Sequence, residues 1–422
     1  MGTRIGVTVV FTLVAIAALA AGSLAGEGRS TDQAILLDQR QIQRSPNSSA
    51  AHLRLGDAYI QKSRQTGDLG YLTLAEQALR RSLELAPGNA GAARHLAYVF
   101  SSRHEFREAA AQAQQAIDLD PRDSHAHGVL GDALLELGKY DEATRAFQAM
   151  ASLDEGLYSL ARLSGMKSLR GDPSGAMADL ERAIAAGRAA GAPPESIAWA
   201  EWQLGAEHFA VGDLGAAETW YLGALRTYAG YHRALAGLAQ VRAAQERYAE
   251  AIDLYGQALA AIPLPEYASA LGDVHAKLGR PDEARKNYQL VEFIGRLNAI
   301  SEVVYNRELA YFHADHRVKL DEALASARSE LEVRQDIFGY DVLAWTLYQS
   351  GRAAEALAPM KEALRLGTKD ARLFFHAGMI HRALGENAAA RDFLRRALST
   401  NPRFHVLHAG VAERALGELE TP

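Results

Sequence analysis

The chain has 422 residues, a formal net charge of −6 and no cysteine. This mild negative charge argues against a dedicated nucleic-acid binder, which would carry a basic stripe. Without cysteine, the chain has neither disulfide bonds nor thiolate metal ligands.

The first 25 residues form the first predicted element. Residues 1–4 form a short, positively charged stretch, and residues 5–21 are apolar and carry no charge. Ser23-Leu24-Ala25 then places small residues at the two positions that signal peptidase reads. The alternative is an uncleaved anchor, because about 20 apolar residues span a bilayer. Both interpretations place the rest of the chain outside the inner membrane, periplasmic or extracellular, and limit membrane contact to this segment. Residues 26–47 follow as a linker or short lead-in helix.

From residue 48 onward, small residues recur with a nearly fixed period. One series of alanines is spaced mostly 33 or 34 residues apart: Ala75, Ala109, Ala143, Ala176, Ala217, Ala251, Ala284, Ala323, Ala356 and Ala390. A second series of small residues precedes it: Gly56, Ala97, Gly131, Ser164, Gly205, Ala239, Gly272, Ala310, Ala344 and Gly378. A period of this length predicts a stack of helical hairpins.

The third unit shows why the small residues are needed. Its pattern predicts one helix over 125–138, with Gly131 midway, and a second over 139–153, beginning just before Ala143. Two helices cross closely only where side chains are small. A bulky residue at either position should cost roughly 1–3 kcal/mol. One hairpin alone leaves an apolar face bare, so the units must stack.

These residues resemble the tetratricopeptide repeat family, over about residues 48–404. The pattern is carried by sets such as Leu55-Gly56, Tyr59, Ala75 and Pro87 in the first unit, and Leu238-Ala239, Tyr248, Ala251, Tyr255, Ala258 and Pro263 in the sixth. The resemblance implies an all-α, right-handed superhelical solenoid of about ten helix-turn-helix repeats. Met150, Val291 and Glu330 depart from it, each standing where the second alanine belongs.

Three places interrupt the period. Residues 64–73 predict a longer loop in the first hairpin, and residues 293–305 predict a longer helix. Residues 187–196 contain Pro193-Pro194, which forbid a continuous helix and separate repeats 1–4 (48–190) from repeats 5–10 (191–404). Residues 405–422 should form a capping helix and tail.

In the family that the chain resembles, the first helix of each hairpin lines a concave groove. This implies a set of groove residues: Arg94, Tyr98, Asp132, Trp199, Trp202, Arg233, Arg307, Tyr311, Trp345, Tyr348, Phe375 and Arg382. Aromatic and arginine side chains dominate binding hot spots and suit a peptide that carries carboxylates. The alternative is that the aromatics pack in the core and the arginines are solvated.

Motifs of catalysis are missing from the sequence: it has no phosphate-binding loop, no His-Glu-x-x-His and no nucleophile elbow. His313 and His316 could share a helix face and hold a metal, but a solvated or capping role is the simpler alternative. We therefore expect no metal, no cofactor and no enzyme. The predicted function is a protein- or peptide-binding scaffold outside the inner membrane; the alternatives are an accessory subunit in polysaccharide export or glycan handling, and self-association end to end.

Overall fold

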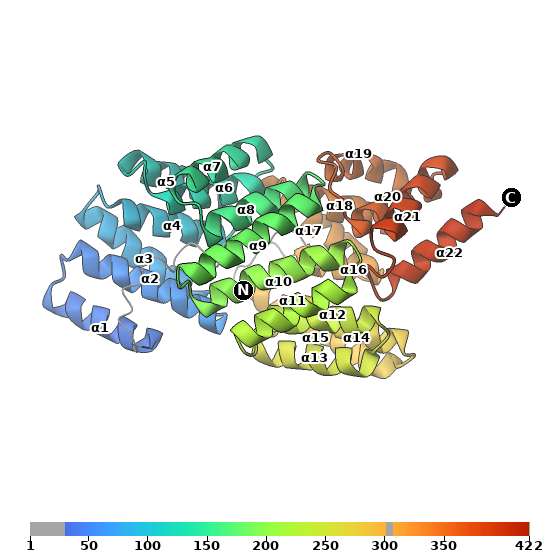
Figure 1. Cartoon of the computed structure of the whole chain (residues 1–422), viewed down its shortest axis with the longest axis horizontal. Helices are drawn as coiled ribbons and strands as arrows, with labels where there is room; N and C mark the ends of the chain where they lie inside the picture. The colour runs from blue at the N-terminus through green and yellow to red at the C-terminus, as the bar shows by residue number, and fades with distance from the viewer. Residues whose placement is uncertain (1–29, 301–306, 422) are drawn as a thin grey trace. The chain divides into compact units, whose positions relative to one another are not determined.

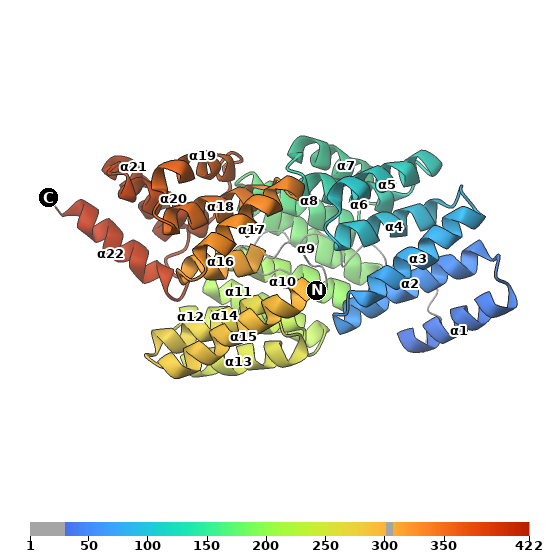
Figure 2. The same cartoon turned by 180° about the vertical axis from the view of Figure 1, so that it is seen from behind.

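The computed structural model describes residues 30–300 and 307–421, without the side chains of 298–300. Two compact units divide between Leu163 and Ser164, inside α8 (Leu157–Leu169). We call the described residues up to 163 unit 1 and those from 164 onward unit 2 (Figures 1 and 2). The sequence placed a break near 190; that grouping of the repeats stays a prediction.

Throughout the described residues the fold is helical, without strands, which confirms the all-α class. Before α8, unit 1 contains α1 (Thr31–Arg44), α2 (Ser49–Thr66), α3 (Gly70–Leu85), α4 (Ala90–Ser102), α5 (Phe106–Leu119), α6 (Ser124–Glu136) and α7 (Tyr140–Leu153). After α8, unit 2 contains α9 (Pro173–Ala189), α10 (Pro194–Ala210), α11 (Leu214–Thr227), α12 (His232–Ala244), α13 (Tyr248–Ala261), α14 (Pro265–Lys277), α15 (Pro281–Ile300), α16 (Arg307–Asp315), α17 (Leu320–Val333), α18 (Ile337–Gln349), α19 (Ala353–Ala363), α20 (Ala371–Ala383), α21 (Asn387–Thr400) and α22 (His408–Glu420).

From α2 to α21 the helices pair into successive hairpins, and each hairpin turns at a residue of positive φ; the turn between α16 and α17 has two, Arg317 and Lys319. In several hairpins this turn residue is a glycine: Gly138, Gly171, Gly212, Gly279, Gly351 and Gly385. Glycine reaches this region at no steric cost, which explains its recurrence at the turn. His104, Glu246 and Arg317 hold the same place with φ of 66°, 62° and 53°.

The mid-helix glycines make room for one large side chain of the second helix. A Cβ added at Gly131 would lie 2.3 Å from the ring of Phe147, and one at Gly272 would lie 2.3 Å from the ring of Tyr288. Gly205 and Gly378 meet Tyr221 and Leu394 in the same way. The predicted close crossing is therefore present, and what occupies the space is a side chain found sixteen residues later in each of these repeats.

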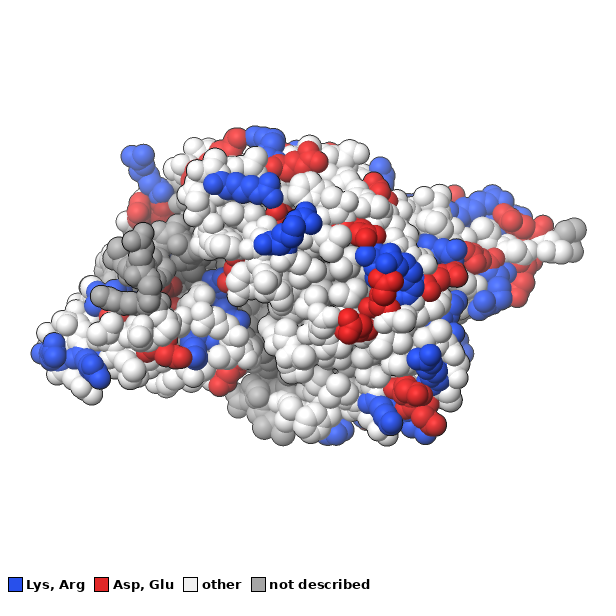
Figure 3. All heavy atoms as spheres, turned by 60° about the horizontal axis from the view of Figure 1, so that its bottom comes forward, with Lys and Arg blue, Asp and Glu red and all other residues white. Residues whose placement is uncertain are grey.

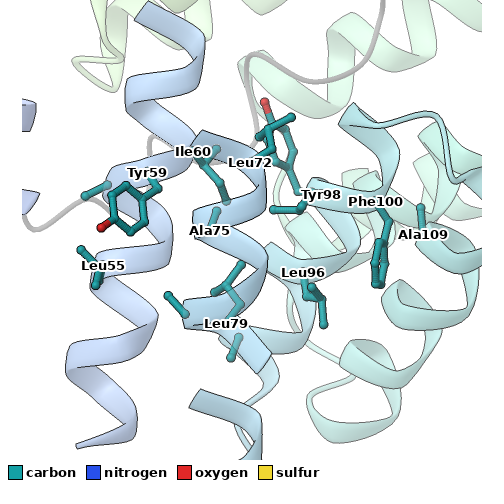
Figure 4. Packing of buried hydrophobic residues seen from close by; sticks show 14 of the residues in the cluster. Leu55, Tyr59, Ile60, Leu72, Ala75, Leu79, Leu96, Tyr98, Phe100 and Ala109 are labelled. Atoms are coloured by element: carbon teal, nitrogen blue, oxygen red, sulfur yellow. The ribbon is translucent and has the colours of Figure 1, made fainter. Parts of the chain in front are cut away.

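The core of unit 1 shows how the repeating alanines are used. Ala75 and Ala109 are fully buried, and Leu79 and Leu96 pack against the same layer (Figure 4). Methyl groups at the alanine positions let adjacent helices approach while larger residues fill the remaining space at high density.

The hairpins stack with their first helices closest together. α4 contacts α6, α10 contacts α12, and α18 contacts α20, whereas second helices of adjacent hairpins make few contacts with one another. A layer whose members lie closer together is the inner layer of a curve. Each unit therefore curves toward its first helices.

Unit 2 curls until its distant hairpins touch. The hydroxyl of Thr368 donates to the carbonyl of Leu169 at 2.5 Å, and the amide of Asn401 donates to the carbonyl of Phe209 at 2.6 Å. Both bonds are buried and join positions nearly 200 residues apart. They hold the last repeats of unit 2 against its first ones.

The interruptions of the period lengthen helices. The prediction of a long loop at 64–73 was wrong, because α2 runs to Thr66 and α3 begins at Gly70. The extra residues of α9 and α10 are also helical and leave only residues 190–193 between them. α15 spans 20 residues and covers part of the predicted longer helix. Within the described ranges no helix is long and apolar enough to cross a membrane, and the predicted signal or anchor lies outside them.

Candidate functional site

In unit 1, predicted groove residues pair with charged residues of the next first helix. Arg94 of α4 donates from Nη1 to both carboxylate oxygens of Asp123 at 3.0 and 2.9 Å. Asp132 of α6 receives Nε and Nη2 of Arg162 from α8 at 2.9 and 2.7 Å. Asp132 and Arg162 are both buried, and burial raises the pKa of Asp132 to about 6. These pairs tie neighbouring repeats together.

Unit 2 repeats this arrangement in its later repeats. Arg307 of α16 donates to Asp336 at 2.8 Å and also lies 2.8 Å from the buried carboxylate of Glu330. Tyr311 donates its hydroxyl to Asp341 at 2.7 Å. Arg307 and Asp336 stand 29 residues apart and Tyr311 and Asp341 stand 30 apart, as Arg94–Asp123 and Asp132–Arg162 do. The spacing marks contacts between successive first helices.

An aromatic cluster surrounds Trp345 of α18. Its indole stacks on His376 at 4.0 Å between ring centroids and on Tyr348 at 5.0 Å, and its Nε1 donates to Asp315 at 2.6 Å. Trp345, Tyr311 and Phe375 are all nearly inaccessible to solvent, while Tyr348 is half-buried.

The chain's own residues 401–408 cover this cluster. Phe404 and His408 pack on Phe375 at 5.5 and 5.2 Å between ring centroids. His405 reaches Asp273 of α14 at 3.5 Å, and backbone N–H groups of Leu407 and His408 donate to its Nδ1. Burial is the main cause that lowers the pKa of His405 to about 3. The segment from α21 to α22 therefore fills the inner side of unit 2 at its later repeats.

A different environment surrounds the first helices of the earlier repeats of unit 2. Trp199, Trp202 and Gln203 share one face of α10, and Arg233 and Gln240 share one face of α12. The guanidinium of Arg233 lies 5.1 Å from the ring centroid of Trp202, a cation–π distance. We call these five residues the α10–α12 wall.

Polar atoms of the α10–α12 wall are buried without hydrogen bonds. Among the described residues, Nε, Nη1 and Nη2 of Arg233 have no partner, nor have Nε1 of Trp199 and Nε2 of Gln240. Oε1 of Gln203 is the one wall acceptor in this condition within the same ranges. Such groups are costly to bury without a partner, and this wall is rich in unused donors.

Two predicted groove residues stand outside these groups. Tyr98 of α4 is buried in the core of unit 1. Arg382 at the end of α20 is half-buried and pairs with Glu418 of α22. The predicted set is thus spread over inter-repeat ties, the covered aromatic cluster and the α10–α12 wall, and its use in binding stays a prediction.

The histidines considered for a metal lie in separate contacts. Nε2 of His313 lies 2.8 Å from Glu292, and Nε2 of His316 lies 3.2 Å from Asp273. In the described part of the chain, no group of three or more His, Asp or Glu side chains is placed to hold a metal ion.

Sequence reasoning missed His376, Phe404, His405 and His408. The contact between His376 and Asp341 could have been predicted, because both lie on first helices and residues about one repeat apart meet across adjacent first helices. Residues 401–408 follow the last repeat and have no periodic position. No spacing rule could have placed them.

The charged surface is mixed. On the face that Figure 3 shows, blue and red side chains alternate and neither sign forms a broad patch. Oppositely charged side chains close in sequence also form ion pairs, such as Arg247 with Glu250 and Arg352 with Glu355. This face offers no basic stripe of the kind that binds nucleic acid.

Comparison with known proteins gives one family match and similar solved structures. The family model described as tetratricopeptide repeat matches residues 94–157, 236–295 and 342–403. Comparison with curated proteins gives no match. Among solved structures, the chain is similar to MamA (22% identity, 40% of this chain and 96% of that chain, TM-score 0.33). It is also similar to YrrB, titled a TPR protein with an unusual peptide-binding site (20% identity, 44% and 94%, TM-score 0.31).

Three matched segments lie in the same phase as the ten hairpins, and the repeat glycines and alanines occupy the positions that the hairpins require. Over these matched segments the chain carries tetratricopeptide repeats.

Proposed function

We propose that this protein is a non-enzymatic scaffold that binds a protein or peptide partner on the inner side of unit 2, outside the inner membrane. The observation that carries the proposal is the α10–α12 wall, where aromatic faces and unused hydrogen-bond donors lie together. Trp and Arg supply much of the binding energy in protein interfaces.

The inter-repeat ties favour this wall over the other predicted groove residues. Arg94, Asp132, Arg307 and Tyr311 already have partners within the chain, and binding a ligand would require breaking those buried bonds. The wall residues have no such bond to lose. The location outside the inner membrane is supported only by the pattern of residues 1–25.

The test is affinity capture from detergent-solubilised envelope with a C-terminally tagged chain, comparing the wild-type chain with Trp199→Ala/Trp202→Ala. The control is Leu119→Ala/Leu153→Ala, which removes exposed apolar residues from the ends of second helices. A stoichiometric partner lost only with the tryptophan pair supports the proposal. Capture that is unchanged by the tryptophan pair contradicts it. A glycan retained in place of a protein would favour the glycan-handling alternative.

The bait also reports on location. If its N-terminal peptide begins after residue 25, or if the intact chain fractionates with the inner membrane and its repeats are accessible from outside, the proposed compartment holds. Repeats protected on the cytoplasmic side would overturn it.

A further inference from the structure

Arg233 of α12 differs from the other buried arginines of the described chain in its surroundings. Arg162 pairs with Asp132, Arg307 with Asp336, and Arg372 lies 3.7 Å over the ring of Tyr311 with Asp315 at 3.6 Å. Arg233 is inaccessible to solvent, yet none of its three guanidinium nitrogens has an acceptor among the described residues. Within the described ranges its guanidinium lies instead against the face of Trp202.

The groups around Arg233 do not neutralise it. His232 hydrogen-bonds the hydroxyl of Tyr267 through Nδ1 at 2.8 Å, and burial lowers the pKa of His232 to about 3, so it is neutral. Burial raises the pKa of Tyr267 well above its ordinary value, while Arg233 acts in the opposite direction. Tyr267 is therefore neutral as well.

The guanidinium of Arg233 donates no hydrogen bond to a carboxylate of the described residues. Glu201 of α10 receives Nη2 of Arg188 at 2.5 Å. Glu266 of α14 lies near enough to raise the pKa of Tyr267, but it makes no hydrogen bond to Arg233. The wall thus presents a planar cation with all its hydrogen-bond donors unused.

Burying a guanidinium without an acceptor is strongly unfavourable, and a carboxylate that receives two of its N–H groups removes that cost. Trp202 of α10 and Tyr267 of α14 are aromatic side chains buried near Arg233.

We infer that the α10–α12 wall binds a partner peptide that carries an Asp or Glu, and that the side-chain carboxylate of this residue is anchored by Arg233 with the neighbouring residues of the peptide against Trp199 and Trp202. The inference rests on the proposed function and specifies the chemistry of the partner.

The experiment uses a display library of random 12-residue peptides, selected on the full chain and, in parallel, on Arg233→Met and Arg226→Met. Arg226 is an exposed arginine of α11, and both variants lose one positive charge. Selected peptides are synthesised with a free and with an amidated C-terminus, and circular dichroism checks that each variant folds.

We expect wild-type selections to share one acidic position, and replacing it by Asn or Gln to weaken binding by about tenfold or more. The same replacement should leave the affinity of the peptide for Arg233→Met unchanged and should weaken binding to Arg226→Met as it does for wild type. Amidation of the C-terminus should not change the affinity. Two results would overturn the inference and leave the proposed function standing. One is peptides selected without a shared acidic position, and the other is that replacing the acidic residue weakens binding to Arg233→Met as much as binding to wild type. Binding that depends on the free C-terminus would also overturn it. Failure to select any peptide would count against the proposed function itself.

Discussion

The inner residues of the two units illustrate two uses of a buried arginine. In unit 1, Arg162 donates twice to Asp132 across adjacent first helices. In unit 2, Arg233 occupies a first helix too, but meets only an aromatic face and no acceptor among the described residues. A satisfied pair fixes how one repeat sits on the next, whereas an unsatisfied cation contributes nothing of that kind. The contrast separates residues that hold the stack together from residues that we propose bind a partner.

Breaking the pair in unit 1 should have the largest effect. Arg162→Met leaves the Asp132 carboxylate buried without its partner and should lower the free energy of unfolding by about 3–5 kcal/mol. Urea denaturation at neutral pH measures the change. Arg145→Met, at an exposed position of α7, is the control and should be nearly neutral. A loss below 1 kcal/mol would show that the pair does not tie the repeats.

The mid-helix glycines give the next largest effect. Gly131→Ala places a Cβ 2.3 Å from the ring of Phe147 and should destabilise the protein by about 1–3 kcal/mol. Gly256→Ala, also inside a helix, meets no atom within 4 Å and should stabilise by up to about 1 kcal/mol. Thermal unfolding of the two variants gives the comparison. Equal effects of the same sign would mean that the ring of Phe147 does not require the space left free by Gly131.

The covered cluster of unit 2 should respond to pH through His405. Its pKa is lowered to about 3, while the unfolded chain titrates near 6.5, so between these values the unfolded state binds the additional proton. As the pH is lowered from 6.5 toward 3, the free energy of unfolding should therefore decrease through this residue, by up to about 1.4 kcal/mol per pH unit.

His405→Asn keeps an acceptor for the N–H groups of Leu407 and His408 but cannot titrate. Denaturant unfolding from pH 6 to pH 4 should show the stability of wild type falling more steeply than that of His405→Asn. Parallel pH profiles would contradict the burial of a neutral His405.

The smallest effect concerns the hairpin turns. His104 has a φ of 66° where six other hairpins place glycine, and His104→Gly should stabilise unit 1 by about 1 kcal/mol or less. Gly138→Ala, at the same place in the next hairpin, should destabilise by a similar amount. Differential scanning calorimetry distinguishes the two directions. Destabilisation by His104→Gly would mean that the ring contact of His104 with Phe106 outweighs backbone strain.

The sequence predicted the fold well because its signal is periodic. Ten small residues in phase located the hairpins, and Gly131 and Ala143 identified their close packing. The loop at 64–73 was misplaced, since inserted residues with helical propensity continued the helix instead.

The candidate site was only partly predictable. Trp202 and Arg233 were both named, but their contact depends on which faces of α10 and α12 meet. Partners such as Arg94 and Asp123 are separated by 29 residues and are recognisable only once the stacking of first helices is known. Residues 401–408 obey no repeat, so their inward course required the structure.

The most direct test of the contrast between the units is the free energy of unfolding of Arg233→Met without any partner. Replacing a buried, unpaired cation by an apolar side chain of similar length should stabilise the protein, by on the order of 1 kcal/mol, while Arg162→Met destabilises it. A loss of stability in Arg233→Met comparable to that of Arg162→Met would show that Arg233 holds the fold together, and would contradict its assignment to partner binding.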